Sequence, residues 1–220
     1  MKRVAAMSKL TGKFVKAALK SQSVWDLGNK VLYKLCADHP GHGSNEVIIA
    51  KTWLIGRAYA AALERRRDAD VLGDAFYLKV AQEFRASKID CWLRDLEPDS
   101  GANRQKAIET HKKLTDLLQP ITRHANRSFA SKYLHFHFPK QFYIYDTRAV
   151  ESARKLVQLD RGRDRSGDVD AEYADFYTRC EQLSESVTGL LERPLCPREI
   201  DKVLLHWNEQ NSKKLRNTSR

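Results

Sequence analysis

Lys132 and Asp146 are the residues of this 220-residue chain whose types and surroundings best suit covalent chemistry. Lys132 lies in an aromatic stretch, flanked at helical spacing by Phe129 and Phe136. An apolar setting disfavours the ammonium form of a lysine, so its pKa can fall toward neutrality, and the neutral amine is a nucleophile. Asp146 begins a new helical pattern, where a carboxylate accepts hydrogen bonds from backbone N–H groups. The pair therefore predicts amine attack assisted by a carboxylate, although a buried aromatic helix followed by a turn and an N-cap explains the same pattern.

Aromatic and basic side chains accompany this pair along the chain. Aromatic rings can stack on an extruded base or a single strand, although most of them are also suited to a core. The candidate base pocket consists of Tyr133, Phe136, Tyr143, Tyr145 and, from the last predicted helix, Trp207. Trp207 suits the core better than it suits a pocket. The candidate phosphate contacts are Arg123, Arg127, Lys140 and Arg148.

The positive charge of the chain is concentrated in three segments. The net charge is +11, and residues 1–20 and 213–220 carry six and four cations without an acid. Residues 101–165, which contain Lys132 and Asp146, hold fourteen Lys and Arg against six Asp and Glu. Such a surface favours phosphate backbones through counterion release, so we expect a DNA partner. A solvated basic face without a ligand is the alternative.

Composition and missing motifs exclude several other classes of protein. The four cysteines are far apart in the sequence and form no Cys-x-x-Cys pair, which favours reduced thiols in the cytoplasm and no metal centre. No apolar run is long enough to span a membrane, and lysines interrupt the N-terminal apolar stretches, which argues against a secretory signal. Metalloprotease, Walker and dinucleotide-binding patterns are absent, so we expect no cofactor.

Helical periodicity dominates the sequence and strand alternation is nearly absent, so we predict an all-α fold of nine or ten helices in two lobes. The predicted organisation is a basic N-terminal helix (1–20), a single two-lobed domain (21–212) and a basic flexible tail (213–220). Pro120 is predicted to begin a short helix of its own, and Pro139 to end the aromatic helix. The predicted helices span 4–20, 23–38, 44–67, 74–96, 103–118, 126–137, 146–159, 170–191 and 198–210, with an extended segment at 141–145.

Three segments resemble the helix-hairpin-helix DNA glycosylase superfamily, in particular bacterial proteins with an 8-oxoguanine DNA glycosylase fold. They are Ala-Ser-Lys-Tyr-Leu-His-Phe (130–136), Tyr-Ile-Tyr-Asp-Thr-Arg (143–148) and Pro-Arg-Glu-Ile-Asp-Lys-Val-Leu-Leu (197–205). The resemblance covers about 125–210. It implies a two-lobed helical fold, with Lys132 in the place of the catalytic lysine and Asp146 in that of the essential aspartate. The family carries a Gly-x-Gly turn in its hairpin, whereas residues 124–129 of this chain contain no glycine, and its lysine and aspartate are further apart in sequence.

The resemblance leads to one expected function and leaves two alternatives open. The expected function is that of a DNA glycosylase with abasic-site lyase activity, acting on a flipped base in duplex DNA that carries damaged or modified bases. The first alternative is a non-catalytic nucleic-acid-binding or defence-associated protein of the same fold. The second is a helical protein that binds an acidic partner through its basic ends. The sequence does not predict the oligomeric state.

Overall fold

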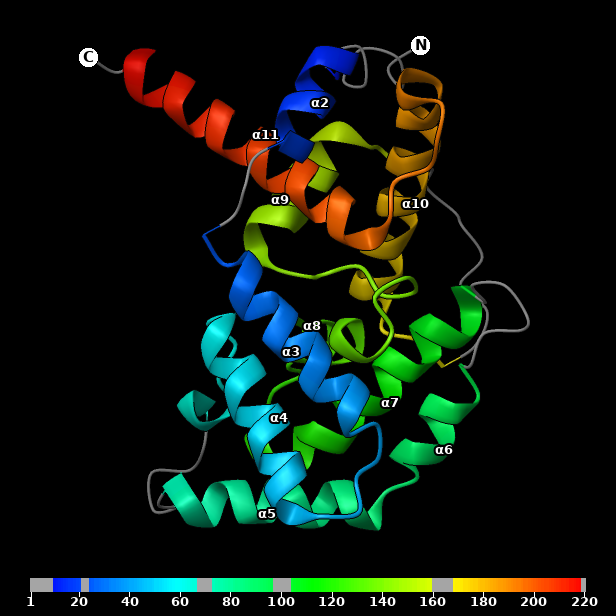
Figure 1. Cartoon of the computed structure of the whole chain (residues 1–220). Helices are drawn as coiled ribbons and strands as arrows, with labels where there is room; N and C mark the ends of the chain where they lie inside the picture. Colours follow the sequence, from blue (N-terminus) through cyan, green and yellow to red (C-terminus); the bar gives the residue numbers. More distant parts are fainter. Residues whose placement is uncertain (1–9, 21–23, 67–72, 97–103, 160–167, 219–220) are drawn as a thin grey trace. The chain divides into compact units, whose positions relative to one another are not determined.

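The structure is a computed structural model that describes residues 10–20, 24–66, 73–96, 104–159 and 168–218, without the side chains of 213–218. The described residues form ten α-helices and one short 3-10 helix, and no strand occurs among them (Figure 1). The predicted all-α fold is confirmed. The helices are α2 (Gly12–Lys20), α3 (Asp26–Asp38), α4 (Asn45–Ala58), η1 (Leu63–Arg66), α5 (Gly73–Ala86), α6 (Ile89–Arg94), α7 (Arg104–Thr122), α8 (Arg127–His137), α9 (Thr147–Leu156), α10 (Ala171–Leu191) and α11 (Pro197–Thr218).

The described helices belong to two compact units of the chain. Unit 1 contains α2, α9, α10 and α11, and unit 2 contains α3 to α8 together with η1. Lys132 therefore belongs to unit 2 and Asp146 to unit 1. The predicted division into an N-terminal helix, one domain and a tail stays a prediction, and residues 1–9, 160–167 and 219–220 lie outside the described residues.

Unit 2 is built around α8. Every residue of α8 from Phe129 to Phe136 is buried, and the helix packs against α3, α4 and α7. A helix that is enclosed on all sides must satisfy any polar group that it buries, since an unpaired buried polar group costs about 1–3 kcal/mol. The polar groups of this buried run belong to Ser131, Lys132 and His135, together with the hydroxyl of Tyr133.

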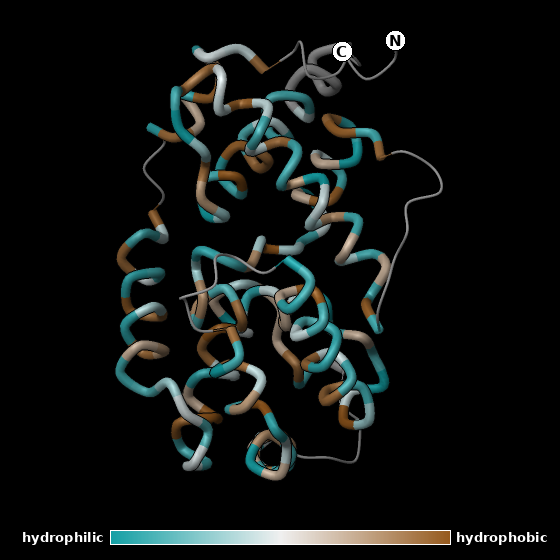
Figure 2. The backbone as a smooth tube through the Cα atoms, turned by 90° about the vertical axis from the view of Figure 1, so that its right-hand side faces the viewer, coloured by the Kyte–Doolittle hydropathy of each residue, from teal (hydrophilic) through white to brown (hydrophobic). Residues whose placement is uncertain are grey.

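Unit 1 is assembled from amphipathic helices around a tyrosine-rich core. Helices α9 and α2 each pack against both α10 and α11. Tyr173 of α10 is fully buried and donates a hydrogen bond to the Tyr143 carbonyl at 3.2 Å, while the Tyr143 and Tyr177 rings lie 4.8 Å apart edge to face. Figure 2 shows hydrophobic and hydrophilic residues alternating along the helices of both units, as one-sided burial requires.

Helix α4 ends at Ala58 and not near residue 67 as predicted. Ala60 has a φ of 51°, in the left-handed region, and the Ala61 N–H donates to the Gly56 carbonyl at 2.8 Å. This arrangement closes the helix as a Schellman motif does, with alanine in the position that usually holds glycine. A Cβ on Gly56 would lie 3.2 Å from the Ala62 Cα, so the small residue permits the chain to turn back over the helix.

Other helix boundaries also differ from the predicted ones. Helix α2 begins at Gly12, and residues 10 and 11 before it are not helical, although a helix was predicted over 4–20. Helix α9 ends at Leu156 and not at residue 159. Pro120 lies inside α7, which continues to Thr122, so the predicted separate helix was wrong. A proline in the last turn removes one intrahelical hydrogen bond, and α7 tolerates this loss. Helix α11 runs to Thr218 and not to 210 because neither glycine nor proline follows Trp207. No helix in the described part of the chain combines the length and apolar character that crossing a membrane requires.

Candidate functional site around helix α8

A tight hairpin joins α7 to α8 and sets the start of the helix that carries Lys132. Arg123 and Asn126 both have left-handed backbones, with φ of 57° and 45°. Thr122 donates from its hydroxyl to the Leu118 and His124 carbonyls, at 2.9 and 3.2 Å. The Asn126 side-chain amide donates to the His124 carbonyl at 2.8 Å. Asparagine tolerates the left-handed region better than most residues, so side-chain hydrogen bonds replace the conformational freedom that glycine gives such a turn.

Lys132 is 2% exposed, and its contacts include two oxygen atoms and an aromatic ring of unit 2. The amine donates to the Ser128 hydroxyl at 2.7 Å and to the Tyr59 carbonyl at 3.5 Å. It also lies 5.8 Å from the centre of the Tyr59 ring. Phe136, one turn further along α8, packs edge to face on the same ring at 5.4 Å. The predicted burial of Lys132 among aromatic residues is therefore present.

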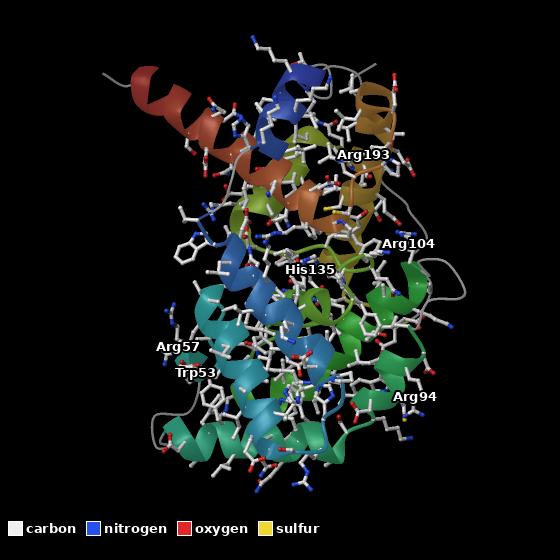
Figure 3. The ribbon with its side chains drawn as sticks, viewed as in Figure 1. Trp53, Arg57, Arg94, Arg104, His135 and Arg193 are labelled. Carbon is white, nitrogen blue, oxygen red and sulfur yellow. The ribbon has the colours of Figure 1, made fainter. Side chains whose placement is uncertain are left out.

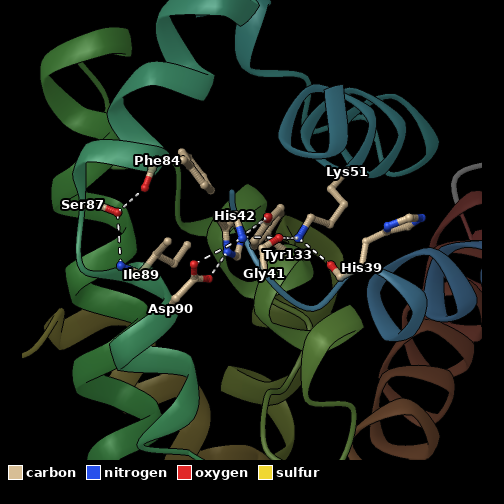
Figure 4. A network of polar contacts seen from close by, with 9 residues as sticks. All are labelled: His39, Gly41, His42, Lys51, Phe84, Ser87, Ile89, Asp90 and Tyr133. Atoms are coloured by element: carbon tan, nitrogen blue, oxygen red, sulfur yellow. Dashed lines mark hydrogen bonds and ion pairs between the residues drawn. The ribbon is translucent and has the colours of Figure 1, made fainter. Parts of the chain in front are cut away.

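A second polar group of α8, the Tyr133 hydroxyl, belongs to a buried network that the sequence did not predict (Figure 4). Tyr133 donates to the His42 Nε2 at 2.6 Å. The His42 Nδ1–H in turn donates to the Asp90 carboxylate at 2.6 Å, which fixes the tautomer of the imidazole. Lys51 is fully buried and donates to the carbonyls of His39 and Gly41, each at 3.0 Å. The network joins α4, α6, α8 and the loop between α3 and α4.

Burial determines the protonation of this network. It lowers the pKa of His42 from 6.5 to about 4, with the Lys51 charge acting in the same direction. The Asp90 carboxylate opposes this shift, but half of its side chain is exposed and water screens its charge. Burial also lowers the pKa of Lys51 to about 8 and raises the pKa of Tyr133 well above 10. His42 and Tyr133 are therefore neutral at pH 7, with Lys51 still mostly charged.

The two histidines of α8 have different surroundings. His135, which is labelled in Figure 3, is fully buried. It donates from Nδ1 to the Phe142 carbonyl at 2.8 Å and accepts from the Tyr33 hydroxyl at 2.6 Å. His137 stacks on His42 at 5.6 Å, and burial lowers its pKa well below 6.5. Among the described residues, no group of three His, Cys, Asp or Glu side chains is placed to hold a metal ion.

In unit 1, Asp146 is the N-cap of α9, as predicted. Its side chain accepts a hydrogen bond from the Ala149 N–H at 2.8 Å, and its backbone is extended. Tyr145 beside it donates to Glu172 at 3.1 Å and packs edge to face on Phe176 at 5.3 Å. The Asp146 carboxylate is half-buried, so one oxygen can cap the helix while the carboxylate remains in contact with solvent.

Replacing Asp146 with alanine is expected to lower the free energy of unfolding by about 1 kcal/mol, because the capping hydrogen bond is lost. Asparagine accepts the same hydrogen bond, so the free energy of unfolding of Asp146→Asn is expected to stay within a few tenths of a kcal/mol of the wild-type value. Urea unfolding followed by circular dichroism measures both. Equal stability of Asp146→Ala and the wild-type chain would contradict the capping role.

The other predicted site residues are distributed over both units. Tyr133 and Phe136 of unit 2 and Tyr143 and Trp207 of unit 1 are buried, and the Lys155 amine lies 5.9 Å from the centre of the Trp207 ring. Each makes core contacts in its own unit, and their role in a base pocket stays a prediction.

The predicted phosphate contacts are more accessible, with one exception. Arg123, Lys140 and Arg148 are exposed. Arg127 is a third exposed, and its Nε donates to both Asp170 carboxylate oxygens, at 2.8 and 2.7 Å. This ion pair engages the guanidinium at the start of α8, so a phosphate would have to compete with Asp170 for Arg127.

Comparison of the chain with protein-family models, with curated proteins and with solved structures found no match.

Proposed function

We propose that this chain is a DNA glycosylase with abasic-site lyase activity, in which Lys132 is the nucleophilic amine and Asp146 the carboxylate. The observation that carries the proposal is the setting of Lys132. Its amine is buried and contacts the hydroxyl oxygen of Ser128 and the carbonyl oxygen of Tyr59. Lys132 also lies only a few residues after a tight hairpin. A buried lysine is the type of lysine that proteins use to form imines with carbonyl carbons.

The hairpin supports a DNA substrate. The helix-hairpin-helix DNA glycosylases have a Gly-x-Gly turn in this hairpin. In this chain the corresponding turn contains Arg123 and Asn126, which both have left-handed backbones. The Asn126 side chain does not cap α8, and the first turn of α8 contains no acidic residue. A helix start of this kind attracts phosphate through its N–H groups and its dipole. Exposed Arg123 adds a cation at the same turn.

The proposed reaction has two stages. In the first, the neutral amine of Lys132 attacks the sugar C1′, the bond from C1′ to the base breaks, and the base leaves as an anion that takes a proton from water. The ring-opened sugar then remains bound to Lys132 as an imine. In the second stage, loss of a C2′ proton breaks the C3′–O bond and cuts the strand, and water releases the sugar from the lysine. Asp146 accepts one proton of the attacking amine and returns it to the ring oxygen as the sugar opens, and its charge favours the positive charge that develops on the sugar.

The test is strand cleavage of a duplex that carries one abasic site. The wild-type chain is expected to release the β-elimination product on a denaturing gel. Asp146→Asn is expected to cut about 100-fold more slowly. Asparagine keeps the helix cap, but it cannot accept the proton that Asp146 accepts. Salt-sensitive binding of the duplex without any cleavage would contradict the enzymatic proposal and favour the non-catalytic DNA-binding alternative.

A further inference from the structure

Helix α2 is fixed to unit 1 by one face. The Thr11 hydroxyl caps its start by accepting from the Phe14 N–H at 3.2 Å. Val15 and Ala18 are fully buried where α2 packs against α10 and α11. Phe14 also contacts His206 of α11, with the ring centres 4.9 Å apart. The apolar side of this short helix is therefore already covered within the unit.

The opposite side of α2 carries lysines. Lys13, Lys16 and Lys20 are exposed, are spaced three and four residues apart, and so share one face of the helix. Helix α2 contains no acidic residue, and none of the three lysines forms an ion pair with another described residue. At a rise of about 1.5 Å per residue, the lysine face extends about 10 Å along the helix.

We propose that the lysine face of α2, defined as Lys13, Lys16 and Lys20, binds the phosphate backbone of duplex DNA. The inference rests on the proposed function for its partner, and it adds three cations of unit 1 to the predicted phosphate contacts. Each of the three ammonium groups is a compact positive charge that attracts a phosphate of the DNA backbone. The face offers neither arginine nor an aromatic ring, so it contributes affinity that is independent of base sequence.

The burial of Val15 and Ala18 favours DNA over a lipid surface as the partner. A basic helix that binds a membrane inserts its apolar face between the lipid headgroups, and it needs that face to be available. In α2 this face is occupied by α10 and α11, so only the charged face remains for binding.

The test is the salt dependence of DNA binding by a triple variant, Lys13→Gln, Lys16→Gln and Lys20→Gln. Affinity for an undamaged duplex is measured by fluorescence anisotropy between 50 and 300 mM salt, about the range in which counterion release is readily detected. A matched triple variant, Lys30→Gln, Lys79→Gln and Lys88→Gln, removes the same charge from exposed positions of unit 2. Both variants should melt at the wild-type temperature, because all six side chains are exposed.

The α2 variant is expected to lower the slope of log affinity against log salt by about 2 to 3, because about 0.9 counterions are released per phosphate contact. The matched variant is expected to keep the wild-type slope. Equal slopes for the two variants would overturn this inference alone. Failure of the wild-type chain to bind DNA would overturn the proposed function together with it. A triple variant that loses binding to phosphatidylserine vesicles, but not to DNA, would overturn the inference in favour of a lipid surface.

Discussion

A Lys132→Gln variant is expected to cut DNA at an abasic site at least about 1000-fold more slowly than the wild-type chain, because the only proposed nucleophile is removed. Glutamine is close to lysine in size, and its side-chain amide retains a hydrogen-bond donor without the amine. Lys132→Arg, which retains the charge but has no nucleophilic amine, is expected to be equally slow. Cleavage rates under single-turnover conditions measure the effect.

The matched control for this loss is Lys140→Gln, which removes an exposed cation from the chain shortly after α8. It is expected to weaken DNA binding modestly and to retain the single-turnover rate at saturating protein. Thermal melting of each variant separates loss of chemistry from loss of fold. A folded Lys132→Gln variant that cuts at the wild-type rate would exclude Lys132 as the nucleophile.

The second large expected effect is a loss of stability in acid. His42 and His111 are buried and neutral, and burial lowers the pKa of each from 6.5 to about 4. Between pH 6.5 and about pH 4 the unfolded chain binds protons that the folded chain does not. The free energy of unfolding is therefore greatest above about pH 6.5 and falls as the pH drops toward 4. Each histidine contributes up to about 3 kcal/mol to this loss, at about 1.4 kcal/mol per pKa unit. Urea unfolding at pH 7.5, 5.5 and 4.5 measures it.

The surroundings of His42 explain why the network does not protect the imidazole from acid. Burial and the charge of Lys51 oppose a positive charge on the imidazole, and the half-exposed Asp90 carboxylate favours it. A His42→Gln variant is expected to be less stable than the wild-type chain at pH 7.5 and to lose less stability on acidification. His39→Gln, at an exposed position of the same loop, is the matched control and should follow the wild-type curve. A wild-type stability that is the same at pH 7.5 and 4.5 would contradict this account.

The sequence allowed the local features of the candidate site to be predicted. Helix α8 was expected over 126–137 and spans Arg127–His137, and Asp146 was expected to cap the next helix and does so. Both features depend on short-range patterns, namely the spacing of aromatic residues and a capping carboxylate before a helical run. The burial of Lys132 followed from the same pattern because its neighbours at helical spacing are aromatic.

The features that the sequence did not predict depend on contacts between distant residues. His42, Asp90 and Tyr133 belong to three separate elements, and no local pattern indicates that an imidazole in a Gly- and Pro-containing loop connects them. The end of α4 at Ala58 similarly depends on the packing of Gly56 against Ala62 and on a left-handed alanine. In the hairpin, residues 124–129 contain no glycine, and hydrogen bonds from Thr122 and Asn126 stabilise the left-handed backbones there.

Borohydride trapping on a duplex with one abasic site tests the proposed function most directly. Borohydride reduces the imine between an enzyme amine and the sugar to a stable secondary amine, so a covalent protein–DNA adduct forms only if that imine exists. We predict an adduct with the wild-type chain and with Asp146→Asn, mapped to Lys132 by mass spectrometry of the digested complex, and none with Lys132→Gln. An adduct that persists in Lys132→Gln, or that maps to another amine, would contradict the assignment of Lys132. Absence of any adduct from a wild-type chain that binds the same duplex would contradict imine chemistry altogether.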